Sequence, residues 1–354
     1  MVVGIGKYSG KRLQWFLEDL YERGNLMINF GTVGTGWITE SFIQAAQLSG
    51  QLQLTSVYSR TEDKAKQLAD TYNASYLYTD LEEMARSSEI EAVYIASPNS
   101  VHFEQTLTFL RNKKHVICEK PIFSTSAELA KAYQTAEENG VYLFEAIRNI
   151  HTPNFNILKD NLHLAGELRS TVLPYMKYSS RYDLFLQGED PNIFSAKYSG
   201  GALVDLGVYP LYLAVGLFGE PKQVTYHPVL LRSGVDGSGT LVLTYGEFVC
   251  TILCSKISHS ELPCEIHGEK GTFVLDDAAP ISNITFVDNR GLEREILGVE
   301  LEEQNMVYEC TNIVRIIETK NDQEYQQLKS WSEIVLRITE EARKQNNIIF
   351  DKEK

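Results

Sequence analysis

The stretch FGTVGTGWIT, residues 30–39, decides the fold, because it joins an apolar strand to a helix through a glycine turn. Gly34, Gly36 and Thr39 occupy the three fixed positions of the G-x-G-x-x-G/A pattern. In such a turn the backbone N–H groups and the N-terminus of the following helix bind a pyrophosphate. Glycines are also common in ordinary strand-to-helix turns, so it is the strand–helix–strand setting that favours dinucleotide binding.

The segments around this turn alternate between strand and helix patterns. The expected strands are residues 27–33, 52–58, 91–98, 115–119 and 141–146. Amphipathic helical patterns lie between them, and this alternation predicts βαβ units in a doubly wound parallel sheet. We therefore assign residues 27–148 to a dinucleotide-binding Rossmann domain.

The rest of the chain has a different rhythm. Residues 241–257, 264–277 and 281–289 are successive strand patterns with turn residues and no helices between them. Such a run predicts a largely antiparallel sheet. The expected fold class is therefore α/β, with an N-terminal Rossmann domain and a C-terminal α+β domain, residues 149–354, built on a largely antiparallel open sheet.

Length and charge restrict the classes of function. A chain of 354 residues is long enough for two domains. Its 33 basic and 47 acidic residues give a net charge of −14, which argues against nucleic-acid and membrane partners. No apolar stretch is expected to span a membrane. The five scattered cysteines favour a cytoplasmic setting, with Cys250 and Cys254 as a core pair and no metal site.

The second strand indicates which dinucleotide is bound. NAD-binding domains usually carry an acidic residue about 20 residues after the glycines, to bind the ribose hydroxyls. Here Ser59, Arg60 and Thr61 stand in that place. An arginine there can bind the 2′-phosphate of NADP, so the sequence favours NADP over NAD. The alternative is a solvated helix cap with a surface arginine.

A second unusual stretch is VICEKPIF, residues 116–123, in which a buried strand runs directly into Glu119 and Lys120. A desolvated charge is costly unless it is paired. In a doubly wound sheet, ligands bind at the carboxyl ends of the strands. The strand is therefore expected to deliver Lys120 to a reaction site, although a lysine at a strand end is equally compatible with a surface position.

Six motifs together resemble the Gfo/Idh/MocA oxidoreductase family, especially the branch of dimeric dihydrodiol dehydrogenase and NADP-dependent D-xylose dehydrogenase. They are GTVGTGWI, SRTEDKAKQLA, IASPNSVHFEQ, CEKP, FEA and GGALVDLGVYPLYL, in this order. The resemblance covers nearly everything from Met27 onward. It implies reversible hydride transfer between a nicotinamide and a hydroxyl or carbonyl compound.

The resemblance also implies roles for single residues. The lysine of the E-K-P motif, Lys120, contacts both nicotinamide ribose and substrate, and the following Lys–Pro bond is often cis. The family's D-x-x-x-H or D-x-x-x-Y element corresponds to Asp205 and Tyr209. The tyrosine form belongs to the dihydrodiol and xylose dehydrogenase branch, which disfavours a myo-inositol substrate. His102 resembles a histidine near the cofactor, with a helix-packing role as the alternative.

The expected catalytic residues are thus Lys120, Tyr209 and Asp205. A lysine about 4.5 Å from the phenol is expected to lower the pKa of Tyr209 to about 7 before any effect of burial. Read alone, a tyrosine in so apolar a helix is more often a core residue. The expected cofactor-binding residues are Gly34, Thr35, Gly36, Trp37, Ile38, Ser59, Arg60, Ser97, Pro98, Asn99, His102, Glu119 and Lys120.

The sequence predicts an NADP-dependent oxidoreductase acting on a small sugar or polyol. A catalytically silent NADP sensor of the same fold is the alternative. We expect a homodimer or homotetramer formed through the C-terminal sheet. Residues 1–26 form an extension that precedes the expected first strand, and Met27 is the preferred start, with an amphipathic helix as the alternative.

Overall fold

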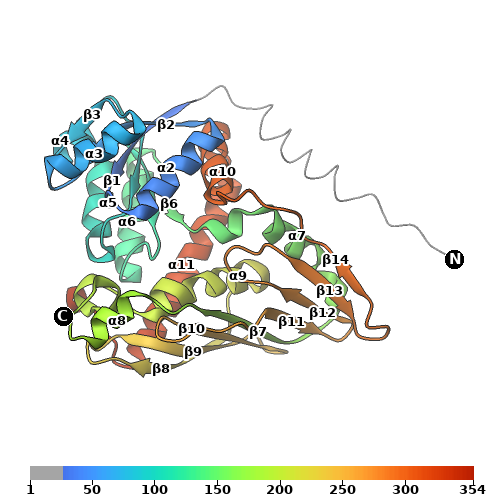
Figure 1. The fold of residues 1–354 in the computed structure, drawn as a ribbon. Helices are drawn as coiled ribbons and strands as arrows, with labels where there is room; N and C mark the ends of the chain where they lie inside the picture. The colour runs from blue at the N-terminus through green and yellow to red at the C-terminus, as the bar shows by residue number, and fades with distance from the viewer. Residues whose placement is uncertain (1–26) are drawn as a thin grey trace.

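The computed structural model describes residues 27–354, so the expectation concerning residues 1–26 lies outside the described residues. Figure 1 shows two layered domains, with the blue and cyan N-terminal domain above the sheet of the C-terminal domain. The first sheet has the strand order β3-β2-β1-β4-β5-β6, and all its pairs are parallel. Its strands are β1 (Ile28–Val33), β2 (Leu52–Tyr58), β3 (Tyr76–Tyr78), β4 (Ala92–Ile95), β5 (His115–Glu119) and β6 (Leu143–Ala146).

The helices that follow these strands complete the predicted Rossmann domain. They are α2 (Trp37–Ser49), α3 (Glu62–Tyr72), α4 (Leu81–Arg86), α5 (His102–Arg111) and α6 (Ser126–Asn139). Local signals fix their ends. In α6, for example, Thr125 and Glu128 form a reciprocal capping box, and Gly140 ends the helix in the left-handed conformation. The central parallel strands β4 and β5 are buried on both faces, as their near-continuous apolar sequences require.

The C-terminal sheet has eight strands in the order β14-β13-β12-β11-β7-β10-β9-β8. One pair, β7 with β10, is parallel and the others are antiparallel, which confirms the predicted largely antiparallel sheet. The strands are β7 (Leu168–Met176), β8 (Gln223–Leu230), β9 (Asp236–Thr244), β10 (Val249–Ser255), β11 (Cys264–Gly268), β12 (Gly271–Leu275), β13 (Ile284–Asp288) and β14 (Arg294–Ile296).

Helices cover one side of this sheet, where the domain meets the Rossmann domain (Figure 1). The α-helices of this part of the chain are α7 (Pro153–Asn161), α8 (Arg181–Leu186), α9 (Val208–Phe218), α10 (Met306–Thr319) and α11 (Asp322–Lys344). Short helical turns are η1 (Asn99–Val101), η2 (Arg148–His151), η3 (Leu162–Ala165), η4 (Asn192–Phe194), η5 (Ala196–Tyr198), η6 (Leu203–Gly207) and η7 (Asp351–Glu353).

One apolar segment, Ala196–Phe218, is long and apolar enough by composition to span a membrane, contrary to the expectation that no such stretch exists. It contains α9, and 72% of its apolar window is buried inside the protein. Nearly all of α9 is buried, because the helix lies between the sheet and the neighbouring helices. It is the central core helix of the C-terminal domain.

Helix α10 returns to the N-terminal domain. Met306, Cys310 and Ile313 belong to the same buried apolar cluster as the Rossmann strands, and α10 packs against α2. Figure 1 shows this helix beside α2, far along the chain from it. The predicted boundary between residues 148 and 149 separates the two sheets. Helix α10 lies after this boundary in sequence but packs on the Rossmann domain.

A buried carboxyl group joins the two domains next to the site. Glu145, in the FEA motif at the end of β6, accepts a hydrogen bond from the backbone of Ile122 at 3.1 Å. Its other oxygen accepts hydrogen bonds from Tyr212 on α9 and Ser332 on α11. Glu145 thereby fixes α9 against the chain that follows β5.

Candidate active site and cofactor cavity

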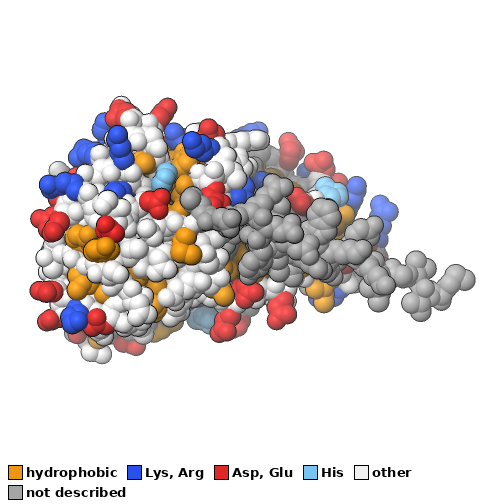
Figure 2. All heavy atoms as spheres, turned by 90° about the horizontal axis from the view of Figure 1, so that it is seen from above, with side chains coloured by type: hydrophobic (Ala, Val, Ile, Leu, Met, Phe, Trp, Pro, Cys, Tyr) orange, Lys and Arg blue, Asp and Glu red, His pale blue; other side chains and the backbone are white. Residues whose placement is uncertain are grey.

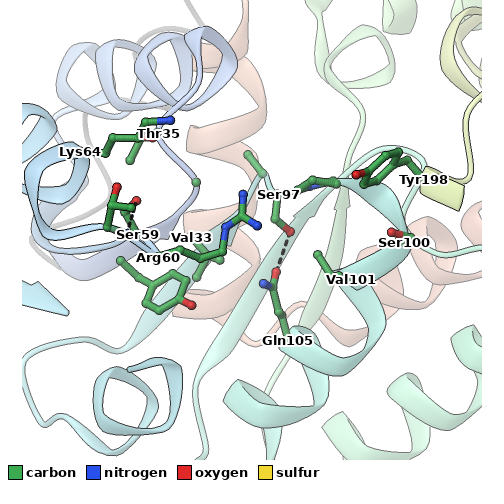
Figure 3. A pocket seen from close by; sticks show the side chains of 15 residues that line it. Val33, Thr35, Ser59, Arg60, Lys64, Ser97, Ser100, Val101, Gln105 and Tyr198 are labelled. Carbon is green, nitrogen blue, oxygen red and sulfur yellow. Dashed lines mark hydrogen bonds between the residues drawn. The ribbon is translucent and has the colours of Figure 1, made fainter. Parts of the chain in front are cut away.

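A cavity of about 590 Å³ opens at the carboxyl ends of β1, β2 and β4. Figure 3 shows Thr35, Ser59 and Arg60 on one side of it and Tyr198 on the other. This edge of a doubly wound sheet, where the strand order reverses between β1 and β4, is where such folds bind nucleotides. The cavity is therefore the candidate dinucleotide site.

The glycine turn has the backbone that this site requires. Gly34 has a φ of +117°, and a Cβ there would lie 2.6 Å from the carbonyl oxygen of Ala96. Gly36 is the N-cap of helix α2 and has no side chain to cap the first N–H groups. A Cβ at this position would meet no atom within 4 Å. The turn thus leaves open space beside the first N–H groups of the helix, which is how a pyrophosphate is bound. These residues fit a dinucleotide.

Two cations from the chain after β2 also line the cavity. Arg60 and Lys64, which is in the first turns of α3, both line the cavity beside Ser59. No carboxylate is among the residues that line the cavity with them. This arrangement provides positive charge for an extra phosphate and no acceptor for a ribose diol.

Nine of the thirteen predicted cofactor residues line the cavity or begin helix α2 beside the glycine turn. Gly34, Thr35, Ser59, Arg60, Ser97 and Pro98 line the cavity. Gly36, Trp37 and Ile38 begin helix α2 next to the turn, and the Trp37 side chain is 71% exposed. The cavity also contains residues that were not predicted, among them Lys64, Gln105 and Tyr198.

Two further predicted cofactor residues support the loops around the cavity. Asn99 donates a hydrogen bond to the carbonyl oxygen of Ser199 in the other domain, at 3.1 Å. His102 is completely buried, and its ring nitrogens lie 2.8 Å from the Ser97 oxygen and 3.2 Å from the Pro121 oxygen. Burial lowers the pKa of His102. Its placement corresponds to the helix-packing alternative.

Glu119 is also internal. Its carboxyl group accepts a hydrogen bond from Tyr94 at 2.6 Å and another from the backbone of Lys120 at 3.2 Å. Burial raises the pKa of Glu119, although the neighbouring Lys120 acts to lower it. At the end of β5, Glu119 is therefore buried in the Rossmann domain, whereas Lys120 points toward the C-terminal domain.

Lys120 forms a charge cluster with the C-terminal domain. Its Nζ lies 2.7 Å from Oδ1 of Asp205 and 3.0 Å from the Asp205 carbonyl oxygen. Lys256, at the end of β10 and 2% exposed, pairs with the other carboxylate oxygen of Asp205. Burial alone would raise the pKa of Asp205, but the two lysines hold it well below its usual range. Asp205 is therefore an ionised bridge between two ammonium groups.

The Lys120–Pro121 bond is cis, as the family resemblance implied. Burial lowers the pKa of Lys120, but the negative charge of Asp205 outweighs it and the pKa stands above its ordinary value. The ammonium group is therefore charged at neutral pH.

Tyr209 completes the cluster. The Nζ of Lys120 lies 5.0 Å from the centre of its ring, and the Arg148 guanidinium lies 5.8 Å away. Asp205 is on the π-helical turn η6 and Tyr209 is in the first turn of α9, so both reach Lys120. Within the described residues the Tyr209 hydroxyl has no hydrogen-bond partner, which leaves it free for a ligand.

The expected lowering of the tyrosine's pKa is wrong for this structure. Burial raises the pKa of Tyr209 to about 12, although Lys120 and Arg148 both act to lower it. The sequence-based expectation counted the lysine but left out the loss of hydration, which favours the neutral phenol. Tyr209 is therefore protonated at neutral pH in the protein without ligands.

Sequence reasoning missed two cations of this site. Lys256 follows a strand pattern in LCSKI, and Arg148 follows the FEA motif in EAIRN. The Nε of Arg148 is buried without a hydrogen-bond partner. A lysine or arginine directly after a buried strand was the signal available, and it was applied to Lys120 alone.

Comparison with known proteins agrees with this geometry. Residues 28–147 match the family model "Oxidoreductase family, NAD-binding Rossmann fold", and residues 166–274 match "GFO/IDH/MocA C-terminal domain". The chain belongs to the Gfo/Idh/MocA oxidoreductase family. Its relatives include dehydrogenases named for hydroxyl substrates, and the chain is an NAD(P)-dependent oxidoreductase.

Two curated relatives and one solved structure illustrate the similarity. The scyllo-inositol 2-dehydrogenase (NADP(+)) IolU of Bacillus subtilis is 41% identical over 324 residues, covering 92% of this chain and 98% of the relative. The trans-1,2-dihydrobenzene-1,2-diol dehydrogenase of Mus musculus is 26% identical over 346 residues, covering 93% and 100%. The 3-ketoreductase KijD10 of Actinomadura kijaniata, solved with NADP, has the same fold, with a TM-score of 0.76, 20% identity and coverage of 88% and 96%.

Proposed function

We propose that this family member is an NADP-dependent oxidoreductase that interconverts a secondary hydroxyl and a carbonyl group on a small sugar or cyclic polyol. The observation that carries the proposal is Tyr209, whose ring lies 5.0 Å from the Nζ of Lys120, which is itself paired with Asp205. A proton donor next to a fixed cation is the arrangement that carbonyl reduction requires.

NADP would be held by the glycine turn at its pyrophosphate and by Ser59, Arg60 and Lys64 at its 2′-phosphate. When bound, it supplies or accepts the hydride. The protein's own residues then bind the substrate oxygen, exclude water and move one proton.

In the direction of reduction, Tyr209 donates its proton to the substrate carbonyl oxygen as negative charge develops there. Lys120 stabilises that charge, and Asp205 holds the ammonium group in place from the other domain. Lys256 pairs with the second oxygen of Asp205, so the carboxylate does not fully neutralise Lys120. In the direction of oxidation, the same groups remove the hydroxyl proton.

The relatives support a substrate with several hydroxyl groups. One is named for scyllo-inositol and another for a trans-dihydrodiol, and both substrates carry hydroxyls on neighbouring ring carbons. The expectation against myo-inositol, which relied on the tyrosine at position 209, stays a prediction, as do a cytoplasmic location and assembly through the C-terminal sheet. Figure 2 shows acidic and basic side chains interspersed over the described part of one face.

The proposed activity is tested by following NADPH absorbance with a panel of inosose, ketosugar and aldose substrates, and NADP reduction with the matching inositols and sugars. Turnover with at least one member is expected. Tight NADPH binding without turnover of any of them would instead favour the silent NADP sensor, which the ion-paired Lys120 and the free Tyr209 hydroxyl argue against.

The cofactor preference gives one prediction. NADP is expected to bind at least tenfold more tightly than NAD, about 1.4 kcal/mol, because Arg60 and Lys64 face its 2′-phosphate. Arg60→Ala is expected to remove most of this difference by weakening NADP alone, as measured by titration of both cofactors. The matched control is Lys66→Ala on helix α3, which follows Arg60, because Lys66 pairs with Asp70 instead. Equal affinities in the wild type would refute the preference.

A second prediction concerns Lys256. Lys256→Met is expected to lower kcat about tenfold and to shift the pH profile of alcohol oxidation to higher pH. The reason is that Asp205 then neutralises Lys120 alone, and less positive charge remains to favour the phenolate of Tyr209. Lys256→Arg should restore most of both properties, and the affinity for NADPH should stay within about threefold. An unshifted pH profile in Lys256→Met would show that the lysine only fills space.

A further inference from the structure

The C-terminal domain contributes one side chain to the cofactor cavity. Tyr198, in η5, lines the cavity together with Pro98, Ser100 and Val101 of the Rossmann domain. Figure 3 shows its hydroxyl end directed toward the cavity, on the side away from Arg60. The ammonium group of Lys197 lies 5.5 Å from the centre of the Tyr198 ring. The Tyr198 side chain thus brings a hydroxyl to the side of the cavity away from Arg60.

The backbone next to Tyr198 is fixed to the Rossmann domain. Ser199 is buried and has a φ of +55°, which non-glycine residues seldom adopt. Its carbonyl oxygen accepts the hydrogen bond from Asn99, and its hydroxyl lies 2.7 Å from that of Ser124, in the chain after the E-K-P motif. These two contacts hold η5 in place across the domain boundary.

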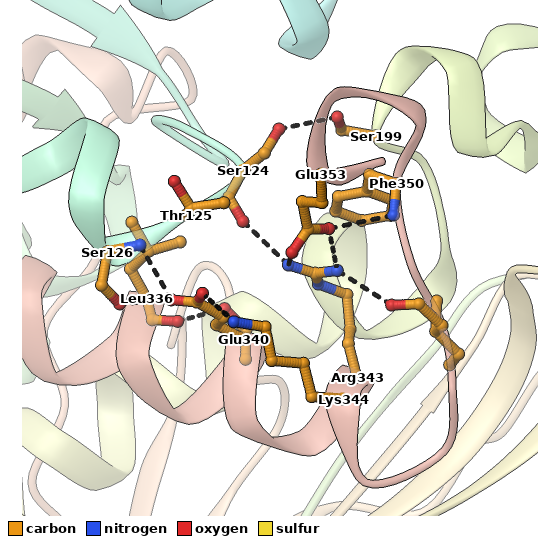
Figure 4. Close-up of polar contacts among 12 residues, drawn as sticks. Ser124, Thr125, Ser126, Ser199, Leu336, Glu340, Arg343, Lys344, Phe350 and Glu353 are labelled. Atoms are coloured by element: carbon orange, nitrogen blue, oxygen red, sulfur yellow. Dashed lines mark hydrogen bonds and ion pairs between the residues drawn. The ribbon is translucent and has the colours of Figure 1, made fainter.

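A buried ion pair fixes Ser124 in turn. Arg343, on α11 and 1% exposed, donates to the Ser124 carbonyl oxygen at 2.8 Å and pairs with Glu353 at 2.7 Å. Glu353, in η7, also accepts from the backbone N–H of Phe350 at 2.9 Å. Figure 4 shows this chain of contacts from Glu353 through Arg343 and Ser124 to Ser199. Turn η7 also contacts η5 directly.

We propose that Tyr198 binds the pyrophosphate–nicotinamide half of NADP(H) through its hydroxyl, and that Arg343 and Glu353 are positioning residues that hold Tyr198 there. This inference rests on the proposed function, because it requires NADP in the cavity. It assigns the second domain a direct part in retaining the cofactor, separate from its part in the chemistry.

The test compares two ligands by titration. NADPH carries the nicotinamide half, and 2′,5′-ADP (adenosine 2′,5′-bisphosphate) lacks it. Tyr198→Phe is expected to weaken NADPH about tenfold and to leave 2′,5′-ADP within about twofold, as expected for one hydrogen bond to a charged or polar oxygen. Arg60→Ala should weaken both ligands. Tyr245→Phe is the control, because the Tyr245 hydroxyl is bonded to the Gly219 oxygen instead.

The positioning role is tested in the same assay. Glu353→Gln is expected to weaken NADPH about threefold and to have no further effect in the Tyr198→Phe background, since it acts through that hydroxyl. Asp351→Asn removes a carboxylate that pairs with Lys354 in the same turn, and it should change nothing.

The possible failures are distinguishable. A wild-type protein that binds neither ligand refutes the proposed function. Two results would overturn the role of Tyr198 in a protein whose wild type binds both ligands. One is an unchanged NADPH affinity in Tyr198→Phe, and the other is an equal loss of affinity for both ligands. Additive losses in the Glu353→Gln, Tyr198→Phe double variant overturn the role of Glu353.

Discussion

Replacement of Lys120 by methionine is expected to lower kcat by about 10² or more while NADPH affinity changes by no more than a few fold. Lys120 is the cation that the cis Lys–Pro turn carries from the end of β5 into the cluster with Asp205. At about 5 Å and an effective dielectric near 20, one ammonium stabilises a unit negative charge by roughly 3 kcal/mol, or about two factors of ten in rate. Methionine keeps most of the side-chain volume and removes this charge.

Lys114→Met is a matched control for this experiment. Lys114 lies just before the other end of β5, where its ammonium group donates to the backbone oxygens of Ser87 and Ile90. Its loss is expected to lower the melting temperature and to leave kcat within about threefold. A Lys120→Met protein with nearly full kcat would mean that the charge beside the substrate comes from elsewhere, with Arg148 as the next residue to test.

The sequence was sufficient to predict the βαβ part of the fold, because each parallel strand is a short apolar run with a capped helix after it. It did not reveal β3, a three-residue edge strand in which Tyr76 and Leu77 are each 40% exposed. It also did not reveal β7, although β7 is internal to the second sheet, because Pro174 interrupts its pattern. Proline in a strand normally argues against an internal position.

The site residues could be predicted where a short sequence motif contains both the reactive side chain and the signal for its place in the fold. Lys120 lies far along the chain from Asp205 and Tyr209, and the structure brings it together with them as the motifs implied. The position of Tyr198 in the cavity was not predictable, because it depends on packing between the domains rather than on any local pattern. The same holds for the return of α10 to the Rossmann domain.

The pKa of Tyr209 could not be derived from the sequence for a related reason. The effect of the lysine charge on this pKa can be calculated from one assumed distance. The opposing effect of burial depends on how much water the hydroxyl loses in the folded protein. The structure shows a 9% exposed tyrosine, and burial raises its pKa to about 12. This changes the expected chemistry: the protonated phenol is ready to act as an acid in carbonyl reduction, whereas oxidation needs its conjugate base.

Tyr209→Phe is accordingly expected to lower kcat by about 10² or more in both directions and to change the pH dependence as well. In the wild type, oxidation should become faster from neutral to alkaline pH, because the phenolate fraction grows about tenfold per pH unit below the pKa of Tyr209. Reduction should stay nearly constant over the same range, because the phenol remains protonated. In Tyr209→Phe the residual oxidation should lose this slope.

Two further variants make the interpretation specific. Tyr175→Phe removes the hydroxyl of the neighbouring ring, which donates a hydrogen bond to the Ala279 oxygen. It should keep the slope and a kcat within about threefold. The Lys120→Met, Tyr209→Phe double variant should be little slower than either single variant, because the two residues act as one unit. Multiplicative losses would show that they act separately, and a retained slope in Tyr209→Phe would assign the proton to another group, with Lys256, whose pKa is lowered by burial, the first to examine.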